Sequence, residues 1–360
     1  MSRAGARIRP WLACSVWVCV VMLLGAAGAH AQVLVNARTG RPFPCPDPSA
    51  VDYGDATYMA CTTDLEPNMF ALWESTDPAR EFWQPDGYVF PAGTRPAWAT
   101  PGGAAWAPDL TRIGDQWVVY FAMAAPEWGS PDSMVIGVAT SPNLAGPWAS
   151  HIVHYLGQFP GTLENYDEVI DPGEARDPYT GQRYLVWSEQ PDAIWIAPLT
   201  PDGMSIQGAT IHRILDAEGD PADCEPGHGC FAEGSSLLFH DRRAYLFYSV
   251  RNAWDRSYAM RSAYASDPMG AWTIEPGYML QAGGSDGPGG GQTPVMVEGR
   301  PMLFYHALAR PDPGYVSDLR MAVGDWLTWH DGRPLVGDGY SPSLSSYPHE
   351  RGAPTDLRAS

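Results

Sequence analysis

Residues 104–122, AAWAPDLTRIGDQWVVYFA, carry the pattern that decides the fold. A short apolar segment is followed by the polar turn RIGD and then by a run of aromatic and β-branched residues. Such runs, when turn residues bound them, are typical of strands, so the stretch predicts a β-hairpin. Amphipathic helical periodicity is hard to find after residue 32, which favours an all-β protein.

The same pattern recurs along the chain with a long period. Its aromatic runs are TYMACTTD, QWVVYFAMA, RYLVWSE, AYLFYSV and PMLFYHA, which begin at Thr57, Gln116, Arg183, Ala244 and Pro301. Successive runs start 59, 67, 61 and 57 residues apart. Five units of about four strands predict a five-bladed β-propeller, because packing around an axis buries both faces of each small sheet. The alternative is a β-sandwich, in which turns recur roughly every 8–12 residues without a longer period.

Before each hairpin turn lies a polar or acidic residue on the strand expected to line the axis. These markers are Asp47, Asp109, Asp171, Glu233 and Gln292. Their similar distances from the following hairpin predict equivalent positions in five blades, with limits near about 40, 100, 160, 225 and 285. The side chains would then meet at one mouth of the central channel. Taken singly, an Asp-Pro pair is more typical of a turn.

Several carboxylates facing one cavity repel one another, so at least one is expected to stay protonated at neutral pH. A protonated acid and an ionised base on opposite sides of a neutral ligand are what hydrolysis of a glycosidic bond requires. The abundant Trp and Tyr residues would supply flat apolar faces for sugars.

The beginning of the chain resembles a signal peptide. Arg3, Arg7 and Arg9 precede an apolar stretch at positions 11–28, and Ala29-His30-Ala31 fits a cleavage site. The alternative is a membrane anchor, for which the apolar run is at the lower length limit. We therefore expect a signal peptide at 1–31, a propeller at 32–340 and a C-terminal tail at 341–360.

Four cysteines remain after cleavage at that site: Cys45, Cys61, Cys224 and Cys230. An even number in an exported chain suggests two disulfides, and four cysteines allow three pairings. The most local pairs, Cys45–Cys61 and Cys224–Cys230, are the expected ones. The predicted destination is the periplasm or the medium.

The net charge of the chain limits the classes of partner that it is expected to bind. The chain has 41 acidic residues against 22 basic ones, all of them Arg, and a formal net charge of −19. So much negative charge disfavours nucleic acid, an anionic membrane surface and polyanionic substrates, and it favours a neutral ligand. Hydrophobic content of 45% supplies a core and excludes a disordered chain. We expect a monomer.

With these motifs the chain resembles glycoside hydrolase family 43, within the five-bladed clan of arabinanases, arabinofuranosidases and β-xylosidases. DPSAVDYGDATYMACTT is similar to the family's first-blade motif, and the WAPD segment at 106–109 to its second-blade motif. VIDPGEARDPYTGQRYLVW resembles the third-blade motif, and FAEGSSLLFHDRRAYLFYS the fourth. Five motifs in order make the resemblance specific, and it covers nearly all of the chain after residue 31.

The resemblance implies an inverting mechanism with three carboxyl groups. By motif, Asp47 would be the general base, Glu233 the general acid, and Asp171 the carboxylate that orients the acid. Asp177 competes for the last role, but it lies inside the predicted turn.

Further residues are expected to bind the sugar. They are Trp106, Asp109, Gln292, His306 and Arg320, with Trp73 and Trp128 as additional stacking candidates. Many relatives have a His in the Gly-rich segment of the last blade that helps to hold an axial metal ion. GPGGGQTP places Gln292 there, so an imidazole ligand is lost; no cofactor is predicted, and calcium is the alternative.

The leading hypothesis is a secreted glycosidase that removes α-L-arabinofuranosyl or β-xylosyl groups from plant cell-wall polysaccharide. The lack of an extra β-sandwich domain favours arabinose. One alternative is a fructan or sucrose hydrolase of a related five-bladed family, although its nucleophile motif and Glu-Cys pair are missing. The other is a carbohydrate-binding propeller without catalysis.

Overall fold

The computed structural model describes residues 31–63, 67–125, 133–155, 158, 168–189, 193–216, 224–225, 229–253, 257–282, 290–291, 293–308, 320–337 and 339. Residues 1–30 of the expected signal peptide, the expected tail 341–360, Trp128 and Gln292 lie outside this part, so the predictions made for them stay predictions. Within the described ranges all regular structure is β, and no helix is long and apolar enough to cross a membrane.

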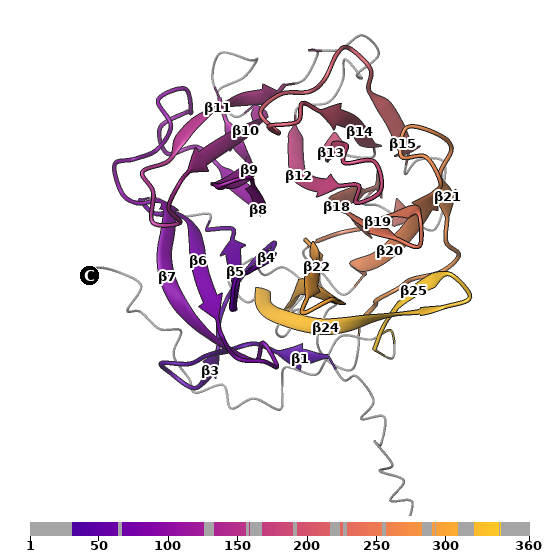
Figure 1. The fold of residues 1–360 in the computed structure, drawn as a ribbon, viewed down its shortest axis with the longest axis horizontal. Helices are drawn as coiled ribbons and strands as arrows, with labels where there is room; N and C mark the ends of the chain where they lie inside the picture. Colours follow the sequence, from indigo (N-terminus) through magenta and orange to yellow (C-terminus); the bar gives the residue numbers. More distant parts are fainter. Residues whose placement is uncertain are drawn as a thin grey trace, which may run out of the picture.

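Five of the six sheets in the described part are arranged in a ring, which confirms the five-bladed β-propeller and excludes the sandwich (Figure 1). The sixth is the two-stranded β16–β17 sheet. The inner strands of blades 1 to 5 are β4 (Ser49–Tyr53), β8 (Ala105–Ile113), β12 (Val169–Arg176), β18 (Ala232–His240) and β22 (Thr293–Val297). The second strands are β5 (Ala56–Cys61), β9 (Gln116–Ala124), β13 (Arg183–Glu189), β19 (Arg243–Val250) and β23 (Arg300–Leu308). These second strands are the five aromatic runs of the sequence.

The outer half of each blade is less regular. The third strands are β6 (Met69–Ser75), β10 (Met134–Ser141), β14 (Ala193–Leu199), β20 (Ala259–Ala265) and β24 (Arg320–His330). The outer strands are β7 (Phe82–Phe90), β11 (Ala149–His154), β15 (His212–Asp216) and β21 (Thr273–Ile274), with β1 (Gln32–Val33) and β25 (Arg333–Val336) flanking β24. The short remaining strands are β2 (Val35–Asn36), β3 (Arg41–Pro42), β16 (Cys224–Glu225) and β17 (Gly229–Cys230).

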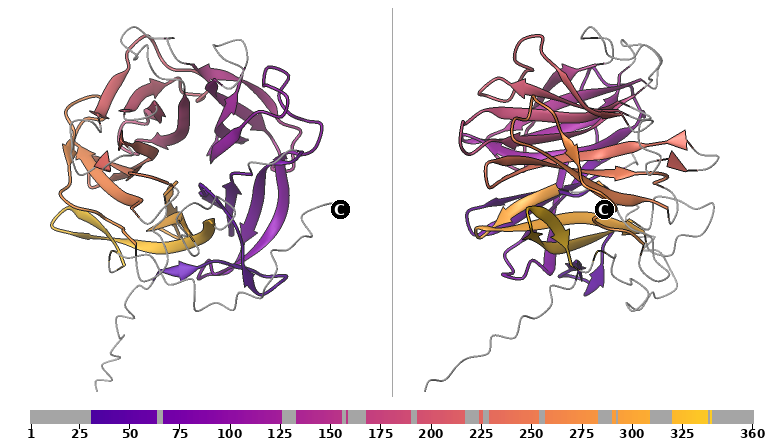
Figure 2. Two further views of the ribbon diagram at one scale, coloured as in Figure 1. Left: turned by 180° about the vertical axis from the view of Figure 1, so that it is seen from behind. Right: turned by 90° about the vertical axis from the view of Figure 1, so that its right-hand side faces the viewer.

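The N-terminal strands close the ring. β1 pairs antiparallel with β24 of the last blade, and β2 pairs parallel with β7 of the first. Figure 2 shows the same ring from behind and from the side. A few residues from one end of the chain thus join the first blade to the last, so that each blade has a neighbour on both faces.

Each gap between blades contains its own hydrophobic core. Between blades 2 and 3, for example, Tyr120 and Val138 pack with Leu185 and Trp187. These four side chains are completely buried, which explains why the second strand of each unit is the most apolar segment. The packing between sheets holds neighbouring inner strands in fixed register around the axis, where the site lies.

Both expected disulfides form. Cys45 bonds to Cys61, and Cys224 bonds to Cys230 across the β16–β17 hairpin. The first of them joins the segment before β4 to the end of β5.

Candidate active site

The inner strands bulge where they approach the axis. In blades 2, 3 and 4 the pairing of the inner strand with its neighbour shifts across two residues. The first of the two is left-handed in each case: Ala107 (φ 49°), Asp171 (φ 53°) and Gly234 (φ 62°). Asp47 (φ 48°) adopts the same conformation just before Pro48. Left-handed backbone is uncommon for residues other than glycine and is concentrated at functional sites.

The four polar markers that the structure describes do not share one register, contrary to the expectation from the sequence. Asp47 and Asp171 occupy the left-handed position, whereas Glu233 lies one residue before it and Asp109 lies two residues after it. Counting back from the hairpin assumes turns of equal length, but β18 and β19 are joined by two residues and β12 and β13 by six.

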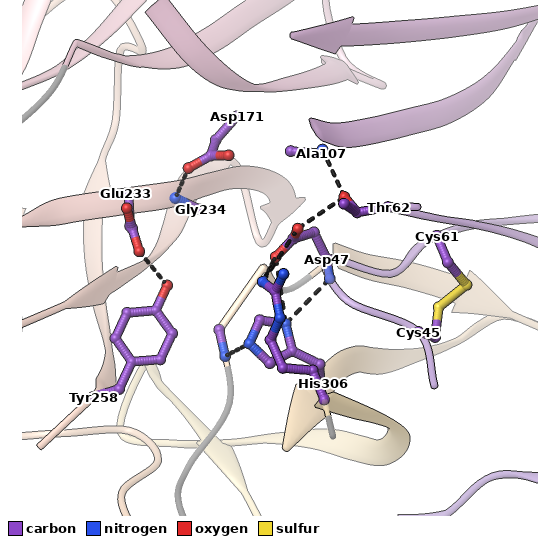
Figure 3. Close-up of polar contacts among 12 residues, drawn as sticks. Cys45, Asp47, Cys61, Thr62, Ala107, Asp171, Glu233, Gly234, Tyr258 and His306 are labelled. Atoms are coloured by element: carbon purple, nitrogen blue, oxygen red, sulfur yellow. Dashed lines mark hydrogen bonds and ion pairs between the residues drawn. A yellow bond between two sulfur atoms is a disulfide. The ribbon is translucent and has the colours of Figure 1, made fainter. Parts of the chain in front are cut away.

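A pocket on the axis is nevertheless lined by residues within or just before the inner strands of all five blades. Its lining residues are Asp47, Pro48, Ala107, Pro108, Asp109, Asp171, Pro172, Gly173, Gly234, Ser235, Ser236, Gly291 and Thr293. Glu233 lies beside it: Gly234 N–H donates to Asp171 Oδ2 (2.7 Å), and the charge of Glu233 acts on Asp171 (Figure 3). The three carboxyl groups assigned by resemblance therefore come together.

Asp47 is held by groups from the first and the last blade. Thr62 Oγ1 donates to Asp47 Oδ2 (2.8 Å), and Arg320 Nη1 donates to Asp47 Oδ1 (3.1 Å). Asp47 N–H donates to His306 Nδ1 (3.1 Å). Arg320 reaches this place because Cys45 N–H donates to the carbonyl of Arg320, so the segment before Asp47 runs along the start of β24.

These contacts favour the charged form of Asp47. Burial opposes its ionisation, but the Arg320 guanidinium, together with His306 and the Thr62 hydroxyl, holds the pKa of Asp47 below its ordinary value. Burial and the Arg320 charge lower the pKa of His306 to about 3, so the ring is neutral and Arg320 supplies the positive charge. A proton added at Nδ1 would face the Asp47 N–H, which also disfavours the charged ring.

Asp171 experiences the opposite environment. Burial raises its pKa well above the ordinary range, and the negative charges of Glu233 and Asp47 raise it further, against the Gly234 N–H bond. Tyr258 donates its hydroxyl to Glu233 Oε1 (2.8 Å), and burial next to that carboxylate raises the pKa of Tyr258 so that it stays a donor. The site thus places one ionised carboxylate opposite a carboxyl pair that retains a proton.

Three of the predicted sugar contacts, His306, Arg320 and the pocket-lining Asp109, have protein partners at the site. His306 and Arg320 are buried against Asp47, and both carboxylate oxygens of Asp109 accept hydrogen bonds from protein groups. Trp73 is buried and stacks on Phe43, with ring centroids 3.9 Å apart, so it cannot serve as a platform.

The positions of Trp106 and Asp177 on their strands bear on the roles predicted for them. Trp106 precedes the bulge of β8, the position that Glu233 has in β18, and it is half-buried. It stays a predicted stacking platform. Asp177 lies past the far end of β12, where its carboxylate accepts from Tyr179 N–H and Thr180 Oγ1 of the turn.

Two functional residues were missed by sequence reasoning. Thr62 accepts the Ala107 N–H (2.7 Å) while donating to Asp47, and Tyr258 contacts Glu233. Thr62 lies in the run TYMACTTD, where the pattern indicates only the end of a strand. No motif in the sequence around Tyr258 indicates a functional role.

The structure offers no metal site in its described part. No group of three or more His, Cys, Asp or Glu side chains there is arranged to hold a metal ion. Gln292, which stands where many relatives have the metal-binding His, lies outside the described residues, so the absence of a metal stays a prediction.

Comparison with known proteins agrees with the site. The model of glycosyl hydrolases family 43 matches residues 42–334. A probable arabinan endo-1,5-alpha-L-arabinosidase A from Aspergillus flavus is 26% identical over 341 residues, which are 88% of this chain and 98% of the relative. An alpha-L-arabinofuranosidase from Humicola insolens is 24% identical over 352 residues, which are 90% of this chain and 68% of the relative.

Solved structures show the same fold. A thermostable family-43 glycoside hydrolase superposes with a TM-score of 0.68 at 18% identity, over 86% of this chain and 96% of the other. The native arabinanase from Bacillus subtilis has a TM-score of 0.62 at 20% identity, over 85% of this chain and 99% of the other. With the family model matched over most of its length, this chain belongs to glycosyl hydrolases family 43 and is a glycosidase that hydrolyses O-glycosyl bonds.

Proposed function

We propose that this enzyme cleaves α-L-arabinofuranosyl linkages in arabinan or its oligosaccharides and inverts the anomeric configuration. The observation that carries the proposal is the opposed environment of Asp47 and of the Asp171–Glu233 pair. Inverting hydrolysis needs an ionised base and a protonated acid at the same time, and these surroundings supply both. The arabinan-cleaving names of full-length relatives support the choice of sugar.

In this mechanism Asp47 takes a proton from water as the water attacks the anomeric carbon. Glu233 gives a proton to the departing oxygen, and Tyr258 orients its carboxyl group. Asp171 accepts the N–H of Gly234 and so fixes the backbone next to Glu233. Because the two carboxyl groups are close together, repulsion between their charges favours keeping one proton on the pair. Arg320 keeps Asp47 ionised.

We propose further that the protein is exported, with cleavage after Ala31. Two disulfides support this, because such bonds persist in oxidising compartments. The substrate in that setting is a polysaccharide or its fragments. A monomer without a metal cofactor remains part of the proposal.

The test is a panel of linear arabinan, arabino-oligosaccharides and chromogenic pentosides and hexosides, with proton NMR of the first anomer released. Asp47→Asn and Glu233→Gln should each lower kcat by about 10²–10⁴-fold, the range for lost general acid–base catalysis. Asp177→Asn is the control, because Asp177 is also buried but lies past the other end of β12.

Retention of configuration would contradict the inverting mechanism. Binding of arabino-oligosaccharide without its cleavage would refute arabinan as the substrate. Wild-type rates in both variants would refute the assignment of Asp47 and Glu233.

A further inference from the structure

Asp109 connects three neighbouring blades. It lies on β8 between β4 of blade 1 and β12 of blade 3, and its side chain is almost completely buried. Ser49 Oγ donates to Asp109 Oδ1 (3.0 Å), and Glu174 N–H donates to Asp109 Oδ2 (2.7 Å). Ser49 Oγ also accepts the Leu110 N–H (2.8 Å). One carboxylate thus binds a donor from the blade on each side.

The two partners stand next to the proposed catalytic residues along the chain. Ser49 lies two residues after Asp47, and Glu174 lies three residues after Asp171. Both aspartates have left-handed backbone, a conformation that the surrounding contacts must hold in place. The equivalent positions in the bulges of blades 3 and 4, Gly173 and Ser236, carry no carboxylate.

We propose that Asp109 is a positioning residue that sets the separation between Asp47 and Asp171. The idea rests on the proposed function of those two residues. It assigns Asp109 a role without sugar contact: its oxygens bind the two flanking strands, so the base and the carboxyl pair are held across the pocket by one rigid group. A displacement of about 1 Å in a catalytic group can cost on the order of 10²-fold in rate.

The contacts do not depend on the charge of Asp109. Burial raises its pKa to about 7, with a contribution from the charge of Glu174. When protonated, Asp109 donates to Ser49 Oγ and still accepts from Glu174 N–H, so both contacts persist. An asparagine reproduces that pattern, because its NH₂ donates to Ser49 and its carbonyl oxygen accepts from Glu174. An alanine loses both contacts.

The test compares Asp109→Ala, Asp109→Asn and the control Thr111→Val, with kcat and KM on the best arabinan substrate well below Tm. Thr111 Oγ1 donates to Glu174 Oε2 (3.2 Å), so the control removes a contact between the same two strands farther from the pocket. We expect Asp109→Ala to lower kcat about 10- to 100-fold with KM within about threefold. Asp109→Asn should keep most of the wild-type kcat, and Thr111→Val should leave kcat unchanged.

A double-mutant cycle separates this proposal from the proposed function. If Asp109 acts through Asp47, Asp109→Ala should cost less in an Asp47→Asn background than in the wild type. An active Asp47→Asn enzyme would refute the role of Asp47 as the general base. It would not by itself refute the role of Asp109 in setting the separation between the strands. An equal loss of kcat in both backgrounds, or in the alanine and asparagine variants, would overturn the positioning role.

Crystal structures of the wild type and of Asp109→Ala provide a readout that needs no activity. We expect the carboxyl groups of Asp47 and Asp171 to change their separation by more than about 0.5 Å, the tolerance of a working site. Unchanged positions would overturn the proposal even if the variant were less stable.

Discussion

Replacing Thr62 by valine should shift the acid limb of the pH–rate profile. Valine has the shape of threonine without the hydroxyl, so the change removes the donor to Asp47 Oδ2 and the acceptor of the Ala107 N–H. A hydrogen bond to a charged group contributes about 1.5–3 kcal/mol, and one pKa unit corresponds to about 1.4 kcal/mol. Loss of this bond should therefore raise the pKa of Asp47 by about 1 to 2 units.

The base has to be ionised, so the acid limb of kcat/KM should move to higher pH by that amount. Activity lost at low pH should return as the pH rises past the new pKa. The assay is kcat/KM from about pH 3 to 8 on a chromogenic arabinofuranoside, with Thr62→Ser, which keeps the hydroxyl, as the control. A folded Thr62→Val enzyme whose acid limb coincides with that of the wild type would refute the reasoning.

Stability should respond in the same variant. Because the pKa of Asp47 in the folded protein lies below its unfolded value, its ionisation stabilises the fold above about pH 4. That contribution disappears as the pH falls through the folded-state pKa. The difference in Tm between wild type and Thr62→Val should therefore be largest near neutral pH and should shrink on acidification.

Three other changes test neighbouring contacts. Tyr258→Phe removes the donor to Glu233 and should lower kcat about 10-fold with little change in KM, and an unchanged kcat would exclude an orienting role. Asp171→Asn should lower kcat by at least about 10²-fold and move the basic limb of the pH–rate profile, whereas a basic limb identical to the wild type would argue against a shared proton. Joint replacement of Cys45 and Cys61 by alanine should destabilise the protein by about 2–4 kcal/mol in urea unfolding, and a smaller loss would mean that the chain holds Asp47 without the bond.

The architecture could be predicted because its signals are local. Each blade contains a hairpin whose strands are neighbours in the chain, and apolar runs separated by short turns identify such a unit without distant contacts. The repeat length then leaves few ways to bury both faces of every sheet. Cys45–Cys61 and Cys224–Cys230 were predictable for the same reason, since each pair closes a short loop.

Part of the site followed from the sequence as well. Asp47 and Asp171 stand in Asp-Pro pairs just before or within the inner strands, and Glu233 stands beside a glycine that adopts the left-handed bulge. What failed was the common register, because turn lengths differ between blades and the bulge cannot be located by counting residues.

What the sequence alone determined is the number of blades and the acidic residues at their inner ends. The tertiary structure decided which groups those acids meet. Arg320 is 273 positions from Asp47 in the chain, and Glu174 is 65 positions from Asp109. No pattern along the chain encodes such a contact, because closure of the ring brings these groups together. The resulting charges and hydrogen bonds keep the base ionised while the carboxyl pair retains a proton.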